Sequence, residues 1–305
     1  MFEVGPSPLP SPVRVQRPGR PPAVVGWLVP AALTVCAASA AHAAPQDAAQ
    51  ALLDAEATLQ EALVTRGERA GWLAYLAESA VSFRPRPVPA RGHWEAQPET
   101  GARHRWQANV AAISGDAEFG WTSGPWLYWN SATGARHAAG GHYLTAWRRE
   151  ADGSWRVVLA ARAPYPVTDS ERDGHLAVVP RLRKPGGGRG REEDCSVQFA
   201  NLWREDGRAE ALEEFGAKDV RLLHTNSPPA DGAKQARRLD TLDGAPLGAN
   251  RVARSLASAG GDLVITYGEY DIPARADAPR RRFVYVQAWD VGRRCRLAAE
   301  LVIPN

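Results

Sequence analysis

The stretch SGDAEFGWTSGPWLYW, from Ser114 to Trp129, has a counterpart in AGGDLVITYGEYDIP, from Ala259 to Pro273. Each begins with a turn of small residues that ends in aspartate, and each continues as an aromatic run with threonine and glycine in step. Gly-Asp pairs favour turns, and aromatic and β-branched runs are typical of strands. The sequence therefore predicts that one strand-rich unit occurs twice in the chain.

The spacing of other residues supports a repeat. Gly67 matches Gly207, and the run from Trp155 to Pro164 overlays Cys295 to Pro304 without a gap, in each case 140 positions apart. A period of this length indicates a duplicated domain and not a solenoid of short repeats.

Hydrophobic spacing predicts the elements of the first copy. Apolar residues recur at helical spacing from Asp47 to Arg66, and Gly67 is placed to end that helix. A short helix over 68–77 follows, then a strand in SAVSFRP, then a third helix over 94–106. Strand-like runs complete the copy at 107–114, 119–130, 141–149 and 155–163.

Residues 167–194 interrupt this pattern. The segment RLRKPGGGRGREED is charged, rich in glycine and without apolar periodicity, which predicts a flexible linker between domains at 46–166 and 195–305. Its glycines do not indicate a phosphate-binding loop, because no Gly-Lys-Ser/Thr sequence ends it.

The first 44 residues are typical of a signal peptide. Arginines precede an apolar run from Pro21 to about Ala41, and AHAA at 41–44 has the small residues that signal peptidase requires. We expect cleavage near Ala43 or Ala44 and a periplasmic or secreted protein. An uncleaved membrane anchor is the alternative, because the run approaches the roughly 18–20 residues that span a bilayer.

Composition narrows the classes of partner. The chain has 305 residues, 44% of them hydrophobic and 23% charged, and a formal net charge of only +3. Its arginines are scattered among acidic residues instead of forming a basic stripe, so no nucleic-acid partner is expected. No membrane association is expected after cleavage of the signal.

Two cysteines, Cys195 and Cys295, remain after the predicted cleavage. A pair of cysteines in an oxidising compartment favours a disulfide, but its formation depends on a distance that the sequence leaves open. A bond would join the first helix of the second copy to its last strand.

The order helix, helix, strand, helix and meander, with the motifs SGD, TSGPW and GHYLTAWRREADGSWRVVL, resembles the nuclear-transport-factor-2-like (NTF2-like) superfamily. More narrowly, it is similar to the SnoaL-like and ketosteroid-isomerase-like domains, many of unknown function. The second copy is more divergent than the first. The resemblance implies an α+β fold of two tandem cone-shaped domains. Each cone would be a strongly curved, mostly antiparallel sheet wrapped around about three helices, with a mostly apolar pocket that binds small molecules.

The resemblance also allows a test for catalytic residues. Ketosteroid isomerases use a helix tyrosine, an aspartate base before a proline, and a second aspartate on a strand. The matching residues are Gln60, Arg84 and Tyr143 in the first copy and Ala200, His224 and Tyr285 in the second. Arginine cannot accept a proton at neutral pH, so no isomerase-type catalytic set is predicted.

The same positions predict a ligand site. Arg84 is expected to point into an apolar cavity, where its charge must be matched. Either a nearby glutamate, Glu95 or Glu118, neutralises it, or it holds the carboxylate of a small apolar ligand, with Gln60 and Tyr143 fixing the orientation of that ligand. The full set of predicted ligand-binding residues is Gln60, Arg84, Trp106, Trp126, Tyr143, His224 and Tyr285. No cofactor is expected, and no metal, because His137 and His142 lack further ligands at suitable spacing.

The sequence thus favours an exported protein that binds a small molecule or acts as an accessory, with its pocket in the first domain. A lyase or isomerase of the ketosteroid-isomerase-like class is one alternative. A purely structural role, in which the two domains dock as an internal pseudo-dimer, is the other.

Overall fold

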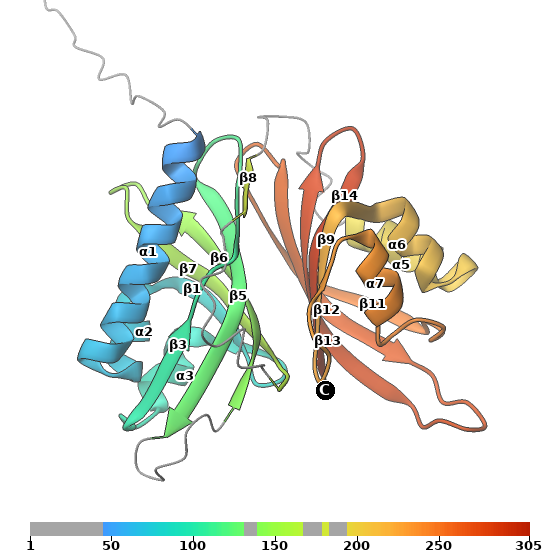
Figure 1. Ribbon diagram of the computed structural model, residues 1–305, viewed down its shortest axis with the longest axis horizontal. Coiled ribbons are helices and arrows are strands. Elements are labelled where there is room, and N and C mark those ends of the chain that lie inside the picture. Colours follow the sequence, from blue (N-terminus) through green and yellow to red (C-terminus); the bar gives the residue numbers. More distant parts are fainter. Residues whose placement is uncertain (1–44, 131–138, 167–178, 183–193) are drawn as a thin grey trace, which may run out of the picture. The chain divides into compact units, whose positions relative to one another are not determined.

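The computed structural model describes residues 45–130, 139–166, 179–182 and 194–305 (Figure 1). The predicted signal peptide, residues 1–44, and His137 lie outside these ranges.

The first half of the described chain is an α+β unit. Its sheet has the strand order β2-β1-β7-β6-β5-β4-β8, with β3 also paired to β5. The elements are α1 (Pro45–Arg66), α2 (Glu68–Tyr75), β1 (Leu76–Phe83), β2 (Pro87–Pro89), α3 (Ala90–Ala96), β3 (Ala102–Trp106), β4 (Val110–Ile113), β5 (Phe119–Asn130), β6 (Ala139–Arg149), β7 (Trp155–Pro164) and β8 (Val179–Leu182).

The second half follows the same order. Its sheet runs β10-β9-β14-β13-β12-β11, which corresponds strand by strand to β2-β1-β7-β6-β5-β4. Its elements are α5 (Asp194–Asp206), α6 (Arg208–Phe215), β9 (Gly216–His224), β10 (Ala230–Asp231), α7 (Ala233–Leu239), β11 (Ala249–Ala257), β12 (Leu263–Ile272), β13 (Arg281–Val291) and β14 (Cys295–Pro304). The predicted fold class, α+β with two sheet-bearing domains, is confirmed.

Glycines at equivalent positions separate the first two helices of each half. Gly67 has φ 91° and Gly207 has φ 102°, values that residues with a Cβ rarely adopt. The chain leaves α1 or α5 there and begins the next helix at once, as the sequence predicted for Gly67.

The predicted third helix over 94–106 is only partly correct. Helix α3 ends at Ala96, and residues 102–106 form β3, which is antiparallel to β5. Pro98 explains the break, because the residue before a proline is driven to extended backbone. Gln97 has the corresponding φ of −82° and ψ of 139°.

The predicted linker also contains a structured segment. Residues 179–182 form β8, which pairs in parallel with β4. Strand β4 would otherwise be the edge of the sheet, and its free N–H and C=O groups offer pairing positions to a passing segment.

Both sheets carry an irregularity at the same place. Apart from the added strand β8, each is antiparallel except where β1 meets β7 and where β9 meets β14. The β6–β7 register shifts after Ala146, and the β13–β14 register shifts after Ala288. Such a β-bulge bends the strand and increases its twist, which suits a sheet that curves around helices.

Three buried apolar clusters form the core. One lies among the helices and sheet of the first half and includes Leu52 and Trp147, and one lies in the second half around Phe199 and Trp289. The third draws on both sheets, with Leu144, Ala146, Leu159, Ile265, Val286 and Leu301 among its members. The two halves therefore share a continuous apolar core.

The repeated Gly-Asp turns contact one another. The amide of Gly115 donates to Oδ2 of Asp262 at 2.7 Å, and the amide of Gly260 donates to Oδ2 of Asp116 at 3.2 Å. Each copy therefore supplies a carboxylate to the turn of the other. The sequence indicated only local turns at these motifs, and this exchange between copies is an additional finding.

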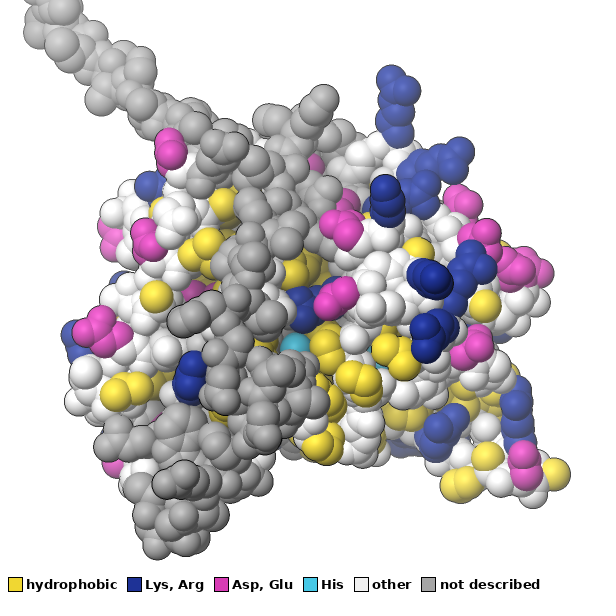
Figure 2. Space-filling view, in the orientation of Figure 1, with side chains coloured by type: hydrophobic (Ala, Val, Ile, Leu, Met, Phe, Trp, Pro, Cys, Tyr) yellow, Lys and Arg dark blue, Asp and Glu magenta, His cyan; other side chains and the backbone are white. Residues whose placement is uncertain are grey.

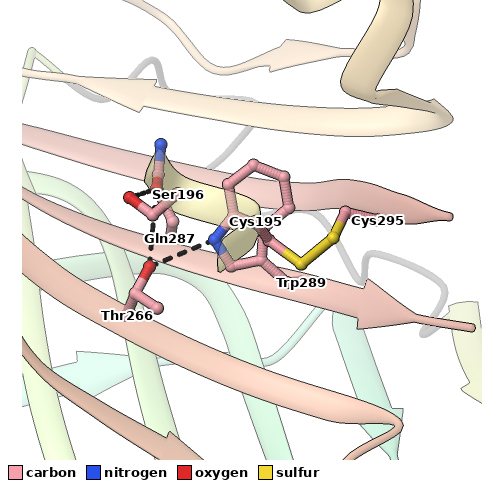
Figure 3. Close-up of a disulfide and its surroundings, with 6 residues drawn as sticks. All are labelled: Cys195, Ser196, Thr266, Gln287, Trp289 and Cys295. Carbon is pink, nitrogen blue, oxygen red and sulfur yellow. Dashed lines mark hydrogen bonds between the residues drawn. A yellow bond between two sulfur atoms is a disulfide. The ribbon is translucent and has the colours of Figure 1, made fainter. Parts of the chain in front are cut away.

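Figure 3 shows that Cys195 and Cys295 form a disulfide, which settles the question that the sequence left open. Their Cα atoms lie 5.6 Å apart, and the bond joins α5 to the start of β14. Close by, Ser196 donates to Gln287 at 2.8 Å, and the Trp289 indole donates to Thr266 at 3.1 Å.

We expect Asp262→Ala to lower the free energy of unfolding by about 1–3 kcal/mol, because it leaves the Gly115 amide and the Ser258 hydroxyl without their buried acceptor. Urea unfolding measures the change. Asp243→Ala, at an exposed position in the same half, is the control and should change the stability by less than about 0.5 kcal/mol. Equal effects of the two substitutions would contradict a stabilising role for the turn contact.

Candidate functional site

A groove of about 430 Å³ lies between α1 and the segment that follows β3. Its lining residues are Gln50, Leu53, Asp54, Glu56, Ala57, Gln60, Trp106, Gln107 and Ala108. The volume is within the range of small-molecule sites, and the lining mixes apolar walls with a few polar groups, as such sites do.

Glu56 is the buried acid of this groove. It lies on the apolar side of α1, between Leu52 and Leu59, and is only 4% exposed. Neither carboxyl oxygen has a hydrogen-bond partner of ordinary geometry among the residues that the structure describes. Burial raises the pKa of Glu56 from its ordinary 4.5 to about 7, although the polar groups of Tyr143, Thr122 and Trp106 oppose the rise.

Tyr143 faces this carboxyl from β6. It is 4% exposed, and its hydroxyl also lacks a partner within the described ranges. Burial raises the pKa of Tyr143 well above 10, and the neighbouring Glu56 charge raises it further. Near neutral pH the pair therefore combines a neutral phenol with a carboxyl that exchanges its proton, so it can both donate hydrogen bonds and accept them.

Tryptophans fill most of the space inside the first cone. The rings of Trp72 and Trp106 stack with centroids 5.9 Å apart, and Trp72 stacks on Trp94 at 5.8 Å. A cavity of about 10 Å³ remains among Trp72, Trp106, Trp126, Tyr143, Thr145, Ala160, Ala161 and Arg162. This is about the room needed by one water molecule. The apolar pocket expected inside the cone is thus small, and the groove outside Trp106 is larger.

Arg162 projects into this tryptophan cluster from β7, where it is the direct partner of Tyr143 on β6. Its guanidinium carbon lies 5.3 Å from the ring centre of Trp126, 5.8 Å from that of Trp72 and 6.0 Å from that of Trp106. These are cation–π distances. The first cone therefore contains a cation as well as the Glu56 carboxyl.

One rim of the groove is held by close backbone packing. A Cβ on Gly124 would lie 1.8 Å from the Gln107 carbonyl oxygen, so only glycine allows β5 to approach this segment. Asn109, two residues further on, accepts a 2.6 Å hydrogen bond from Arg221 of the second half. Both halves therefore position the rim.

The structure gathers four of the predicted ligand-binding residues. Gln60 and Trp106 line the groove, while Trp106, Trp126 and Tyr143 line the small cavity behind it. The Gln60 side-chain oxygen accepts a hydrogen bond from the Trp106 amide at 3.1 Å, which places Gln60 as a support for the rim.

The expected position of Arg84 is wrong. The residue is exposed, just after β1 ends at Phe83, and does not line the cavity. Its guanidinium lies 5.8 Å from the Trp94 ring centre and donates to His93 at 3.2 Å. The backbone turns here, with the Arg84 amide donating to the Arg86 carbonyl. Arg84 therefore belongs to this turn and not to the strand that faces the cone interior.

His224 and Tyr285 lie apart from the other four, in a buried polar network of the second half. His224 hydrogen-bonds Thr241 at 2.7 Å, and Tyr285 contacts the Ser196 hydroxyl at 3.2 Å. The same network contains the Arg208 ion pairs with Asp240 and Glu300. Most of its groups bond to one another, which is the arrangement of a polar core.

Sequence reasoning missed Glu56 and Arg162. Glu56 had a usable signal, because it is an acid at helical spacing within the apolar series of Leu52, Leu59 and Leu63. No such signal marks Arg162. The bulge near Val158 changes which side chains of β7 face inward, so counting alternate residues along the strand does not place Arg162 in the cone.

The described part of the chain contains no cluster of three or more histidine, cysteine or acidic residues arranged to hold a metal ion. No helix within it combines the length and the apolar character that a membrane span requires. On the face shown in Figure 2, acidic and basic side chains are interspersed over the second half.

No family model and no curated protein matches the chain. Several solved structures are similar to it over about a third of its length. A protein described as a SnoaL-like polyketide cyclase from Mesorhizobium loti is 16% identical, with a TM-score of 0.26, covering 36% of this chain and 96% of that one.

Two further structures show the same extent of similarity. An NTF2-like protein from Cytophaga hutchinsonii is 13% identical, with a TM-score of 0.30 and coverage of 37% and 93%. A ketosteroid isomerase-like protein from Erwinia carotovora atroseptica is 17% identical, with a TM-score of 0.30 and coverage of 37% and 94%. The structures that the chain resembles therefore include NTF2-like, SnoaL-like and ketosteroid-isomerase-like proteins, as the sequence resemblance predicted.

The raised pKa of Glu56 predicts a pH-dependent stability. The folded protein keeps this proton up to about pH 7, whereas the unfolded chain releases it near 4.5. The stability linked to Glu56 is therefore full below pH 4.5 and is lost as the pH rises through 7, by up to about 3 kcal/mol.

Urea unfolding of the wild type and of Glu56→Gln between pH 4 and pH 8 measures this effect. The glutamine variant, which cannot ionise, should become progressively more stable than the wild type as the pH increases. A stability difference that does not change with pH would show that Glu56 titrates normally.

Proposed function

We propose that the protein is an exported small-molecule-binding protein whose first half holds the ligand in the groove beside α1. The observation that carries this proposal is the buried Glu56 carboxyl in a groove of about 430 Å³. The ligand class is a small, mostly apolar molecule with a polar group.

The groove supplies both kinds of contact that such a ligand needs. Leu53, Ala57 and Trp106 provide apolar surface, and a ligand group that reaches past them meets the buried Glu56 carboxyl. A buried carboxyl without a partner costs free energy, so a ligand hydroxyl or carbonyl that bonds to it gains more there than at an exposed site. The Tyr143 hydroxyl interacts with this carboxyl and adds a second polar group beside it.

The second half fits an accessory role. Its sheet shares a core cluster with the first sheet, and its Arg221 bonds Asn109 at the groove rim. We propose that the two halves act as an internal pseudo-dimer in which the second half supports the site of the first.

Acid–base catalysis is a second candidate function. It is favoured by the pKa of Glu56, about 7, next to the neutral Tyr143 hydroxyl. A carboxyl that titrates near neutral pH can both take up and release a proton, as a lyase or isomerase requires. Loss of turnover with retained binding in Glu56→Gln would distinguish this function from binding alone.

The export proposal rests on the residues before Pro45 and on the disulfide. Arginines, an apolar run and AHAA at 41–44 have the order of a signal peptide. The bond between Cys195 and Cys295 is typical of proteins that fold in an oxidising compartment.

Filling the groove should abolish binding. We expect Ala57→Phe to weaken the binding of 2-naphthol, a neutral apolar probe with one hydroxyl, by about tenfold or more, because the new ring occupies the groove. Isothermal titration calorimetry at pH 7 measures the affinity. Ala51→Phe, on the same helix but outside the groove lining, is the matched control and should bind as the wild type does. Equal affinities of all three proteins would refute the groove as the site.

Export has its own test. Expression of the full chain in a Gram-negative host, followed by N-terminal sequencing of the product, should find a start at Ala44 or Pro45. The mature protein should be recovered from the periplasm. An intact N-terminus in the membrane fraction would instead support the anchor.

A further inference from the structure

We propose a second binding site in the first half, separate from the groove, in which Arg162 holds the carboxylate of a small organic acid. The site lies on the other side of Trp106, where Arg162, Thr145 and Tyr143 line the tryptophan cavity. It goes beyond the proposed function because it uses a different group and a different ligand charge.

The Arg162 guanidinium has N–H donors that are not used in hydrogen bonds to described residues. An arginine side chain carries five N–H donors and no acceptor. For Arg162 the only hydrogen-bond acceptor within the described ranges is His104 Nδ1, at 3.4 Å, and no described carboxylate forms an ion pair with it. The three indole rings around it offset only part of the cost of removing the charge from water. An anion is therefore the complementary ligand.

His104 keeps the nearest acid away from Arg162. Its Nε2 lies 2.7 Å from Glu68, so the imidazole stands between the carboxylate and the guanidinium. Since arginine can only donate, the hydrogen-bond partners assign Nδ1 as the acceptor and Nε2–H as the donor to Glu68. Burial lowers the pKa of His104, and the Arg162 charge lowers it further against the opposing bond to Glu68. The ring is therefore neutral and leaves the positive charge of Arg162 uncancelled.

A second cation reinforces the positive potential. Burial lowers the pKa of Arg162 to about 10, and the charge of Arg84 contributes to this fall while Glu68 opposes it. Arg162 thus remains charged at neutral pH. Among these interacting groups, Glu68 is one acidic side chain beside two arginines, Arg84 and Arg162. Arg84, although exposed and outside the cavity, assists the approach of an anion.

The shape of the site selects a carboxylate. The cavity of about 10 Å³ accepts one water-sized atom, such as a single carboxylate oxygen. Arg162 is itself partly exposed, so the second oxygen and the apolar body can remain on the open side. A planar carboxylate matches the guanidinium through two parallel hydrogen bonds, and the indole edges offer contact to an aromatic ring.

The test compares benzoate, benzamide and inorganic phosphate on the full chain by isothermal titration calorimetry at pH 7. We expect benzoate to bind about tenfold or more tightly than benzamide, which has the same shape without the charge. This comparison needs no variant. Equal affinities for benzoate and benzamide, or tighter binding of phosphate than of benzoate, would overturn the proposal.

Variants then locate the site. Arg162→Met should weaken benzoate binding by about tenfold or more, and Arg162→Lys should weaken it less, because a charge is kept without the planar fork. Arg238→Met, at an exposed position on α7, is the matched control and should bind benzoate as the wild type does.

The groove variant distinguishes this site from the proposed function. Ala57→Phe should lose 2-naphthol and retain benzoate, whereas Arg162→Met should do the reverse. Loss of benzoate in Ala57→Phe with retention in Arg162→Met would assign benzoate to the groove and overturn the second site. Failure of 2-naphthol to bind the wild type would refute only the groove.

Discussion

Each sheet of this protein has two apolar faces but helices for only one of them, and the burial of the second face is the constraint on which the fold depends. Leu144 and Ala146 of the first sheet and Val286 and Ala288 of the second belong to one cluster. A single copy would expose this surface to water, since burial of apolar area is the main driving force of folding. The shared core removes that cost and leaves the helix-covered face of the first half available for a site.

The two copies use their interiors differently. Position 68 is glutamate in the first copy, and the matching position 208 is arginine in the second. In the second copy Arg208 forms ion pairs with both Asp240 and Glu300 inside the core. In the first copy the corresponding acid bonds a histidine, and Arg162 is left with donors available. The second half thus has an ion-paired polar core, whereas the interior of the first half holds an arginine with N–H donors available.

Much of the fold was predictable from the sequence, because its signals are local. The apolar series of α1, the glycines at 67 and 207 and the Gly-Asp turns each act over a few residues, and the glycine and Gly-Asp signals occur in both halves. Strand β3 was not predicted, because a helix over 94–106 is incompatible with the extended backbone that Pro98 imposes on Gln97.

The site was less predictable for physical reasons. Alternate residues of a strand point to opposite faces of the sheet, so the face of a residue can be predicted by counting only where this alternation is unbroken. The bulge in β7 lies before Arg162 and places it on the opposite face from the one that counting predicts. Alignment to a family placed Arg84 in the cavity, but the chain turns at the end of β1 and carries its side chain outside. The mutual placement of Glu56 and Tyr143 depends on how α1 lies across the sheet, a long-range property that no short motif encodes.

The bond between Cys195 and Cys295 gives the two halves different responses to mechanical force. It joins residues that are 100 positions apart and encloses almost the whole second half in a covalent ring. The sequence from 45 to 194 contains no cysteine, so no such ring exists in the first half. When the chain is pulled from its two ends, tension passes through the sulfur bridge, and the enclosed residues add no contour length. Under force the half that carries the groove can be fully extended, whereas the residues between Cys195 and Cys295 remain enclosed by the disulfide.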